Sequence, residues 1–537
     1  MPPGAVTVKP GAKAAGAIVF MVDGLSGIIV EEMLADGKLP TLKKYFVDRG
    51  LYAPRAVAHV PSVTLANITS IATGLLPGHH TVTGNHWFDR CKYVYRNYET
   101  LAQKNTLDCD YAAPTVFEML DDEFTASLFF QANRGSDKWF ENWLSAGVAF
   151  YLGWYDLVDR VSLYRFKELA ELARKRGQWP ALTISYLLTP DFCAYRQGLE
   201  GPHYRQCLVE LDFQLGRVLG DFERAGLLDK LAILLVSDHG MCPVNNHSRL
   251  KEMIEDHPDL NVAKKYLWEK TSFADRKKYY DRFSAVVDRT GDRYLGLWLR
   301  KPVFKNGRFA HWDDWSQRPT AAEIAAYPAA RGGTIDIFKL LLDQHAVEAI
   351  AYSAGPNRVR VRRSMGEAEF SQPAGRGGDV TYRLVSGTDP FEWEGTVPAE
   401  LLAGKPAAPR QWLDATEHTP FPAFIASLLA FFREENRRAD VMAFARPDWD
   451  FHTVLNAGHG GLRDCEAYIP VMAAGPGIPH GRVSTVRSTD IVPTVLELLG
   501  RPIPPHLDGR SILKSNIYHA RAADTQPAAT RPASTAP

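Results

Sequence analysis

The chain has 537 residues, which is long enough for one large catalytic domain with insertions or for two to three domains of ordinary size. Its hydrophobic share of 45% and charged share of 23% are typical of a soluble globular protein and exclude a disordered or fibrous class. Lys plus Arg and Asp plus Glu number 62 each, and this balance argues against nucleic-acid binding and against a basic membrane-binding surface.

The cysteines and the two ends of the chain bear on its location. The six cysteines are scattered without a C-x-x-C pair, so we expect free thiols in a reducing compartment rather than structural zinc or a dense disulfide framework. No apolar run of signal-peptide length precedes residue 17, and no transmembrane stretch is evident, which predicts a cytoplasmic location. The Ala-, Pro- and Thr-rich residues 520–537 are expected to form a disordered tail.

Short apolar strands alternate with helical segments through the first half of the chain. The predicted strands lie at 17–22, 53–59, 126–130, 182–188 and 231–236. Such a pattern indicates a mostly parallel sheet with helices on both faces, which is a three-layer α/β/α sandwich. In such sheets the functional residues gather beyond the carboxyl ends of the strands. Asp23, Asp191 and Asp238 each directly follow a predicted strand.

The helix after the second strand is predicted to begin near Thr64. Pro61 disfavours helix just before it, and apolar residues recur at helical spacing after it. A hydroxyl there lies among unpaired backbone N–H groups at the positive end of the helix dipole, which favours a phosphate or a developing oxyanion. Asn67, three residues on, could donate its amide to the same anion. The simpler interpretation is that Thr64 is only an N-cap.

The sequence pattern changes between residues 251 and 414. A polar, aromatic-rich stretch is followed by segments at 358–362 and 382–385 that alternate like antiparallel strands. We interpret 251–414 as an inserted cap or lid beside the site, with a solvent-facing elaboration as the alternative. The catalytic core would then comprise 17–250 and 415–515. Its expected later elements are a helix near 421–433, strands near 440–445 and 468–473, and a helix at 490–499.

The three aspartates at strand ends predict metal ions. Carboxylates brought to one edge of a sheet would repel one another unless cations neutralised them. His239, directly after Asp238, and His459, between glycines at 458–461, could complete the ligand set. Mixed aspartate and histidine ligands suit zinc, with manganese or iron as alternatives. Each piece alone is compatible with ordinary turn chemistry, so the prediction depends on their coincidence at strand ends.

These motifs resemble those of the alkaline phosphatase superfamily, and within it the type I phosphodiesterase/nucleotide pyrophosphatase family. The resemblance covers most of residues 17–245 and 420–513. The matching segments are VDGL at 22–25, PSVTLANITSIATGLLPGHHTVTGN at 61–85, LDFQLGRVL at 211–219, VSDHGM at 236–241, GHGG at 458–461 and STDIVPTVLELLG at 488–500. The resemblance implies an alkaline phosphatase-like fold with two metal ions.

The resemblance also implies roles for the matched residues. Thr64 would be the nucleophile, giving a phosphothreonine intermediate, and Asn67 would help to hold a nonbridging phosphoryl oxygen. The implied metal ligands are Asp23, Thr64, Asp238 and His239 for one ion, and Asp191, His459 and a further histidine for the other. Sulfatases of the same superfamily would need Cys or Ser in a C/S-x-P-x-R context at the nucleophile, and Thr64 lacks that context.

One position departs from the family pattern. The family usually shows D-x-x-x-H where this chain has Asp191 followed by Tyr195. The spacing places both side chains on one face of a helical turn, but a phenol is an uncommon zinc ligand. His203 or a solvent ligand could substitute, or the second site could be weak or hold a different metal. The other histidines near the motifs, interpreted as structural or rim residues, are His79, His80, His86 and His247.

The leading hypothesis is a metal-dependent hydrolase of phosphoric esters, acting on phosphodiester or nucleotide pyrophosphate bonds of a small phosphorylated substrate. The alternative within enzymes is a phosphomonoesterase or phosphonate hydrolase, which would need a cation near the substrate dianion, with Arg196 as one candidate. An alternative of another class is a degenerate one-metal protein, marked by Tyr195, that binds nucleotides or other phosphorylated ligands without turnover. A nucleophile at Thr64 argues against that alternative.

Overall fold

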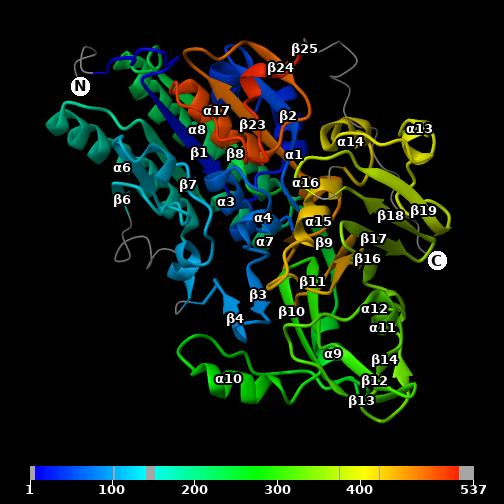
Figure 1. Cartoon of the computed structure of the whole chain (residues 1–537). Coiled ribbons are helices and arrows are strands. Elements are labelled where there is room, and N and C mark those ends of the chain that lie inside the picture. The colour runs from blue at the N-terminus through cyan, green and yellow to red at the C-terminus, as the bar shows by residue number, and fades with distance from the viewer. Residues whose placement is uncertain (1–5, 101–102, 141–151, 374, 423, 519–537) are drawn as a thin grey trace.

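A computed structural model of the chain describes residues 6–100, 103–140, 152–373, 375–422 and 424–518 (Figure 1). The tail expected at 520–537 lies outside these described residues. None of the helices within the described ranges is both long and apolar enough to cross a bilayer.

A central sheet of nine strands organises the first half of the chain and its last hundred residues (Figure 1). In spatial order the strands are β25 (Ile517–Tyr518), β24 (Gly481–Val483), β2 (Leu51–Val57), β23 (Tyr468–Ala474), β8 (Leu231–Ser237), β1 (Gly16–Val22), β7 (Leu182–Leu187), β5 (Thr125–Leu128) and β6 (Lys138–Phe140). Strands β8 through β6 form one parallel block, whereas β23 runs antiparallel to both β2 and β8. The prediction of a mostly parallel sheet is confirmed.

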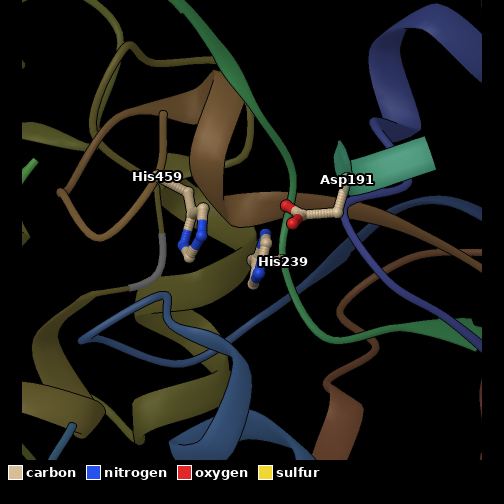
Figure 2. Close-up of side chains that lie close together, drawn as sticks. All are labelled: Asp191, His239 and His459. Atoms are coloured by element: carbon tan, nitrogen blue, oxygen red, sulfur yellow. The ribbon is translucent and has the colours of Figure 1, made fainter. Parts of the chain in front are cut away.

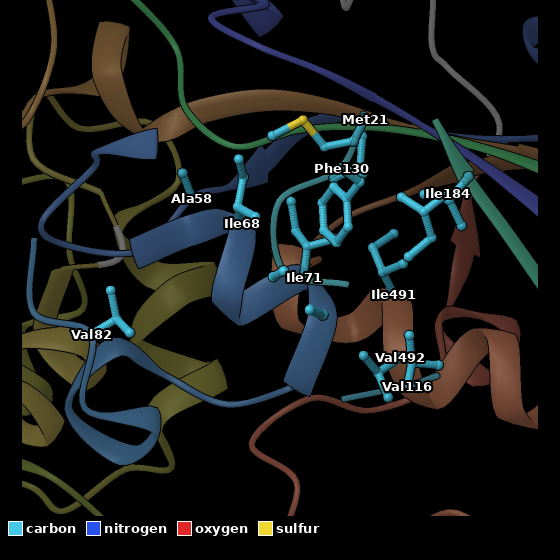
Figure 3. Packing of buried hydrophobic residues seen from close by; sticks show 14 of the residues in the cluster. Met21, Ala58, Ile68, Ile71, Val82, Val116, Phe130, Ile184, Ile491 and Val492 are labelled. Atoms are coloured by element: carbon cyan, nitrogen blue, oxygen red, sulfur yellow. The ribbon is translucent and has the colours of Figure 1, made fainter. Parts of the chain in front are cut away.

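The two faces of this sheet are covered by different helices, because successive strand residues point to opposite sides. Val19 and Met21 of β1 belong to a core with helices α3 and α17 (Figure 3). Ile18 and Phe20 belong to a core with α1, α6 and α8 on the other face. These helices are α1 (Gly27–Ala35), α3 (Thr64–Thr73), α6 (Tyr155–Arg176), α8 (Pro202–Arg224) and α17 (Ile491–Leu498). The structure is therefore the three-layer α/β/α sandwich that the sequence predicted.

The remaining helices and strands are mostly short. The helices are α2 (Pro40–Leu42), α4 (Pro77–His80), α7 (Thr189–Gln197), α9 (Leu250–Glu255), α10 (Phe273–Tyr280), α11 (Ala321–Ala325), α12 (Ile337–Leu342), α13 (Ala399–Leu402), α14 (Pro409–Thr416), α15 (Phe424–Phe431) and α16 (Asp464–Ala467). The short strands are β3 (His86–Asp89), β4 (Val94–Asn97), β9 (Cys242–His247), β12 (Pro302–Lys305), β13 (Arg308–Trp312), β14 (Tyr327–Pro328), β15 (Thr334–Ile335), β21 (Asp448–Asp450) and β22 (Ala457–Gly458).

A second sheet of seven strands lies beside the central one and is antiparallel throughout. Its strands, in spatial order, are β10 (Ala285–Gly291), β11 (Tyr294–Leu299), β20 (Val441–Ala445), β16 (Val347–Gly355), β17 (Arg358–Arg363), β18 (Gly366–Ser371) and β19 (Thr381–Gly387). The antiparallel strands expected at 358–362 and 382–385 are confirmed as parts of β17 and β19. Whether residues 251–414 act as a cap stays a prediction.

One assignment from the sequence is wrong. The run at 440–445 was expected in the catalytic core, but it forms β20, which lies between β11 and β16 of the second sheet. Helix α15 packs on the same sheet through the core that contains Phe370 and Phe424. A fully apolar strand is compatible with any buried position in a sheet, so local composition does not specify its partners.

Candidate metal and phosphoester site

The predicted carboxylates follow three neighbouring strands of the central sheet and lie at the same edge of it. Strands β8, β1 and β7 lie side by side and run parallel, so their carboxyl ends meet at one edge. Asp23 follows β1 and Asp238 follows β8, while Asp191 lies in the first turn of α7 just after β7. His459 follows the short strand β22. The fold thus brings together residues that are more than four hundred positions apart.

The first group of potential metal ligands consists of Asp23, Asp238 and His239, all of which are buried. The His239 Nε2 atom lies 3.3 Å from Asp23 Oδ1 and 3.4 Å from Asp238 Oδ2. Neither of these two carboxylate oxygens has a hydrogen-bond partner among the described residues. The Thr64 hydroxyl lies 3.2 Å from the same His239 Nε2. This group contains three of the four ligands expected for the first ion, and the fourth, Thr64, is adjacent.

The second group consists of Asp191, His239 and His459 (Figure 2). The two imidazole rings stack with centroids 3.5 Å apart, and the Asp191 carboxylate faces them. Asp191 Oδ1 is buried and has no hydrogen-bond partner in the described part of the chain. Asp191 and His459 therefore lie together as expected, with His239 shared between the two groups.

Both histidines direct an unprotonated ring nitrogen, Nε2, toward the site. Nδ1 of His239 donates to the Gly240 carbonyl at 3.0 Å, and Nδ1 of His459 donates to the Ser62 carbonyl at 2.7 Å. A neutral imidazole that donates from Nδ1 keeps a lone pair on Nε2. Burial lowers the pKa of both rings, and His459 lowers the pKa of His239 further. Two neutral imidazoles with Nε2 directed inward are suitable metal ligands.

The three buried carboxylates also favour a bound cation. Burial raises the pKa of Asp23, Asp191 and Asp238, and the Asp23 charge raises the pKa of the other two further. Removing several carboxylates from water costs free energy unless a positive charge compensates them. Their unpaired oxygens and the two lone-pair imidazoles together form the donor set that a divalent metal ion prefers. The residues present therefore fit the two ions that the resemblance implies.

Thr64 is the first residue of α3, and Val63 before it is extended. The side chain of Thr64 does not cap the helix; its hydroxyl donates to His239 Nε2, because Nδ1 of that ring already carries the proton. The N-cap interpretation of Thr64 is therefore wrong. Its place at the positive end of the helix dipole agrees with the prediction.

The structure gives different positions to two asparagines near Thr64. The Asn67 amide is fully buried; it accepts from the His59 N–H and donates to the carbonyls of His59, Pro61 and Val63. Its hydrogen-bonding capacity is used by the backbone, so the structure does not bring it to the site. Asn85, which the sequence analysis did not single out, accepts from the Leu65 N–H at 2.9 Å and thus lies beside Thr64. Asn85 lies in the recognised segment 61–85, which was the available signal.

Tyr195 occupies the position of the expected histidine. Its hydroxyl lies 2.6 Å from Nε2 of His459. Asp292, from the turn between β10 and β11, lies against the same two side chains, with its Oδ2 3.7 Å from His459 Nε2. Burial raises the pKa of Asp292 to about 7, although the Tyr195 hydroxyl lowers it by hydrogen bonding. No sequence signal pointed to Asp292, because it lies in the region interpreted as an insertion.

The other candidates lie away from the two groups. His203 is exposed at the start of α8 and belongs to neither group. Arg196 is exposed and stacks over the Tyr155 ring of α6 at 4.8 Å, so the structure does not direct it toward a substrate dianion. The histidines interpreted as structural have partners outside both groups: His79 with Asp508, His80 with Ser70, His86 with Asp288 and His247 with Asp450.

The expectation of free thiols throughout is wrong. Disulfides join Cys193 to Cys207 and Cys242 to Cys465, and the two free cysteines are Cys91 and Cys109. The second disulfide links positions 223 residues apart, so no local spacing could have revealed it. The first links α7, which carries Asp191, to α8, and the second lies just beyond His239. Both disulfides therefore fasten segments that carry potential ligands.

Comparisons with curated proteins give relatives at low identity. The chain is 24% identical over 232 residues to an uncharacterized pyrophosphatase/phosphodiesterase of Schizosaccharomyces pombe, covering 43% of this chain and 45% of that protein. It is 25% identical over 165 residues to human ectonucleotide pyrophosphatase/phosphodiesterase family member 7, covering 25% and 36%. It is 24% identical over 208 residues to ectonucleotide pyrophosphatase/phosphodiesterase 2 of Saccharomyces cerevisiae, covering 36% and 40%. The match spans less than half the length of each relative.

Solved structures support the fold. Murine ectonucleotide pyrophosphatase/phosphodiesterase 5 superposes with a TM-score of 0.52 at 14% identity, covering 91% of this chain and 96% of that chain. An inactive threonine-to-alanine variant of the same murine protein, in complex with AMP, superposes with a TM-score of 0.53. Residues 17–310, more than half of the chain, match the family described as type I phosphodiesterase/nucleotide pyrophosphatase. The chain therefore belongs to the type I phosphodiesterase/nucleotide pyrophosphatase family.

Proposed function

We propose that this protein is a metal-dependent hydrolase that uses Thr64 to cleave phosphodiester or nucleotide pyrophosphate bonds. The observation that carries the proposal is the Thr64 hydroxyl beside two groups of potential metal ligands at the carboxyl edge of the sheet. Membership of the family supports the reaction class. The murine neighbour that is inactive with a threonine replaced, and that binds AMP, supports a nucleotide-containing substrate.

Divalent ions held by the two groups would lower the pKa of the attacking hydroxyl and neutralise charge on the phosphoryl group. The chain itself positions the nucleophile, because α3 begins at Thr64 and the hydroxyl is held by His239. Thr64 Oγ would attack phosphorus, giving up its proton, as the ester oxygen leaves and takes up a proton. Water would then cleave the bond between phosphorus and Thr64 Oγ, which releases the phosphorylated product and restores the Thr64 hydroxyl. The Asn85 amide, whose oxygen accepts from the Leu65 N–H, would donate to an equatorial oxygen, and the positive end of the α3 dipole would stabilise the charge.

Two observations favour a diester over a monoester. A phosphomonoester carries an additional negative charge, which an enzyme usually offsets with a cationic side chain. The candidate for that role, Arg196, instead contacts Tyr155 and the Gly153 carbonyl. The two groups of potential ligands contain only aspartates and histidines, so neither group supplies such a cationic side chain. We therefore propose a singly charged phosphoryl centre as the substrate.

The proposal is tested by comparing three substrates on the full chain: bis-p-nitrophenyl phosphate, p-nitrophenyl phosphate and a dinucleotide pyrophosphate. We expect kcat/KM to be higher for the diester and the pyrophosphate than for the monoester. Acid-quenched samples should carry the transferred phosphoryl group on the peptide that contains Thr64. Thr64→Ser, which keeps a hydroxyl, is the matched control for Thr64→Ala. A preference for the monoester would favour a phosphomonoesterase, and no turnover of any substrate would favour the binding-protein alternative.

A further inference from the structure

The turn between β10 and β11 is fixed to the loop that carries His459. Asp292 and Arg293 form this turn, and the Arg293 N–H donates to the His459 carbonyl at 3.0 Å. The buried Arg293 guanidinium pairs with Glu466 at 2.6 Å, and Glu466 also accepts from the Gly461 N–H. Backbone and side chain therefore hold Asp292 at a defined place next to His459.

Glycines at the contact let the turn and the loop pack closely together, with no space for a larger side chain at Gly291. A Cβ on Gly291 would lie 2.4 Å from Val63 Cγ1, directly before Thr64, and a Cβ on Gly458 would lie 3.2 Å from Asp292 Cβ. Closely packed backbones transmit position well, because interiors have few voids. A segment of the second sheet is thus part of the wall of the candidate metal site.

The Asp292 carboxylate belongs to neither group of potential ligands, but it lies next to His459, where the family pattern has a further histidine. Its Oδ2 is buried without a hydrogen-bond partner among the described residues, as is Oδ1 of Asp191. Oδ2 lies 3.7 Å from His459 Nε2, whose lone pair accepts the Tyr195 hydroxyl at 2.6 Å. Buried carboxylate oxygens without partners are costly and are normally compensated by a charge or a donor.

We propose that Asp292 replaces the absent histidine as the third protein ligand of the second metal ion, together with Asp191 and His459, and that Tyr195 is a positioning residue. This deepens the proposed function, on which it rests for the presence of the second ion. An ion on His459 Nε2 would displace the Tyr195 hydroxyl from that nitrogen. The hydroxyl would then donate to Asp292 instead and fix the orientation of the carboxylate.

The proposed ligand set also changes which ions the site prefers. Two carboxylates and one imidazole form an oxygen-rich set, whereas the family pattern offers one carboxylate and two imidazoles. Oxygen ligands favour harder ions such as manganese, while imidazoles suit zinc. We therefore expect the second site of this chain to select manganese over zinc more strongly than a site with the histidine would.

The test measures metal binding on the full chain, without reference to turnover. Stripped protein is titrated with Mn²⁺ and with Zn²⁺ by calorimetry, and bound metal is counted by mass spectrometry after dialysis. The variants are Asp292→Asn, Tyr195→Phe and the double variant Asp292→Asn with Tyr195→His. Asp448→Asn is the matched control, because Asp448 is exposed on β21, close to Phe451, which donates to the Asp292 carbonyl.

We expect two ions per chain in the unchanged protein and in Asp448→Asn. Asp292→Asn should retain the first ion and bind the second about 100-fold more weakly, since loss of even a supporting partner costs about 10- to 100-fold in affinity. Tyr195→Phe should keep two ions with about 10-fold weaker binding of the second. The double variant should recover the second ion with zinc preferred, which also shows that Asp292→Asn chains can fold.

Unchanged affinity for the second ion in Asp292→Asn would overturn the proposal, as would a single ion in the unchanged protein. Complete loss of the second ion in Tyr195→Phe would also overturn it, because Tyr195 would then be a ligand itself. Failure of the proposed function can be distinguished from failure of this ligand assignment. Two ions in the unchanged protein and one in Asp292→Asn would support the assignment. If no phosphoester were hydrolysed by that protein, the proposed activity would nevertheless be refuted.

Discussion

The Tyr195 hydroxyl lies 2.6 Å from Nε2 of His459, which is the nitrogen that the ring presents to the candidate metal site. Nδ1 of the same ring is held by the Ser62 carbonyl at 2.7 Å, so Nε2 carries a lone pair and accepts the phenolic proton. A lone pair accepts one partner at a time. Tyr195 and a metal ion therefore compete for His459, and the nearby Asp292 gives the displaced hydroxyl another acceptor.

The buried ion pair between Arg293 and Glu466 should stabilise the fold and hold the β10–β11 turn next to His459. Both side chains are fully buried, and the pair joins the β10–β11 turn to the loop of His459. Arg293→Ala would leave Glu466 buried and unpaired, so we expect a loss of about 3–5 kcal/mol in the free energy of unfolding.

Chemical denaturation measures this loss, with Arg331→Ala as the control. Arg331 pairs with Asp259 on the exposed surface and should contribute nothing measurable. Equal stability of the two variants would show that the buried pair does not fasten the turn.

Replacing Asn67 should mainly lower the stability of the protein, whereas replacing Asn85 should mainly lower its activity. Asn67→Ala removes the partner of four buried backbone groups, and we expect it to cost about 3 kcal/mol of stability. Asn85→Ala removes one bond to the Leu65 N–H and, in our proposal, a donor to the phosphoryl group. It should cost about 1 kcal/mol of stability and about 100-fold in kcat.

Thermal unfolding and bis-p-nitrophenyl phosphate hydrolysis of the two asparagine variants are measured together. If Asn67→Ala kept full stability but lost turnover, that result would support the phosphate-holding role that the resemblance implied for Asn67.

His86 should make stability depend on pH. Burial lowers the pKa of His86, but the carboxylates of Glu99 and Asp288 outweigh burial and raise it to about 10. The unfolded chain has a histidine pKa of about 6.5. The folded state binds the proton more tightly, so this stabilisation is complete below pH 6.5 and is lost as the pH rises toward about 10.

Urea denaturation of the native chain and of His86→Gln at several pH values from 6 to about 10 measures this contribution. The stability difference between them should be largest at pH 6 and should decrease steadily. A difference that does not change with pH would mean that His86 has the same pKa in the folded and unfolded states.

The cysteines should fall into two classes in thiol titration. Denatured protein that was never reduced should show two reactive thiols, from Cys91 and Cys109, and reduced protein should show six. Disulfides persist in oxidising compartments and are rare in the cytosol. Six thiols without reduction would instead agree with the cytoplasmic location expected from the sequence.

The layered core and the potential ligands at strand ends could be predicted because their signals are local. A strand such as β1 is an apolar run, and Asp23 directly follows it, so both are visible in a few consecutive residues. Strand β20 has the same kind of run, but its partners β11 and β16 are distant in sequence, and its place in the second sheet was therefore mispredicted.

The role of each side chain depended on distant contacts. Asn67 stands at a suitable helical spacing from Thr64, yet the chain before α3 turns back and uses its amide. Asp292 reaches His459 only because the Arg293 turn of the second sheet docks on the loop after β22. Nothing in the sequence near Asp292 indicates such a contact. The motifs therefore predicted where the candidate site lies, whereas Asp292 was found beside it only from the tertiary structure.

The most direct measurement is hydrolysis of bis-p-nitrophenyl phosphate by the native chain and by Thr64→Ala, before chelation, after chelation, and after resupply of zinc or manganese. We predict turnover that is lost on chelation and recovered on resupply, with Thr64→Ala reduced by at least about 1,000-fold under every condition. Full activity in Thr64→Ala, or activity that chelation leaves unchanged, would contradict a metal-dependent hydrolase that acts through Thr64.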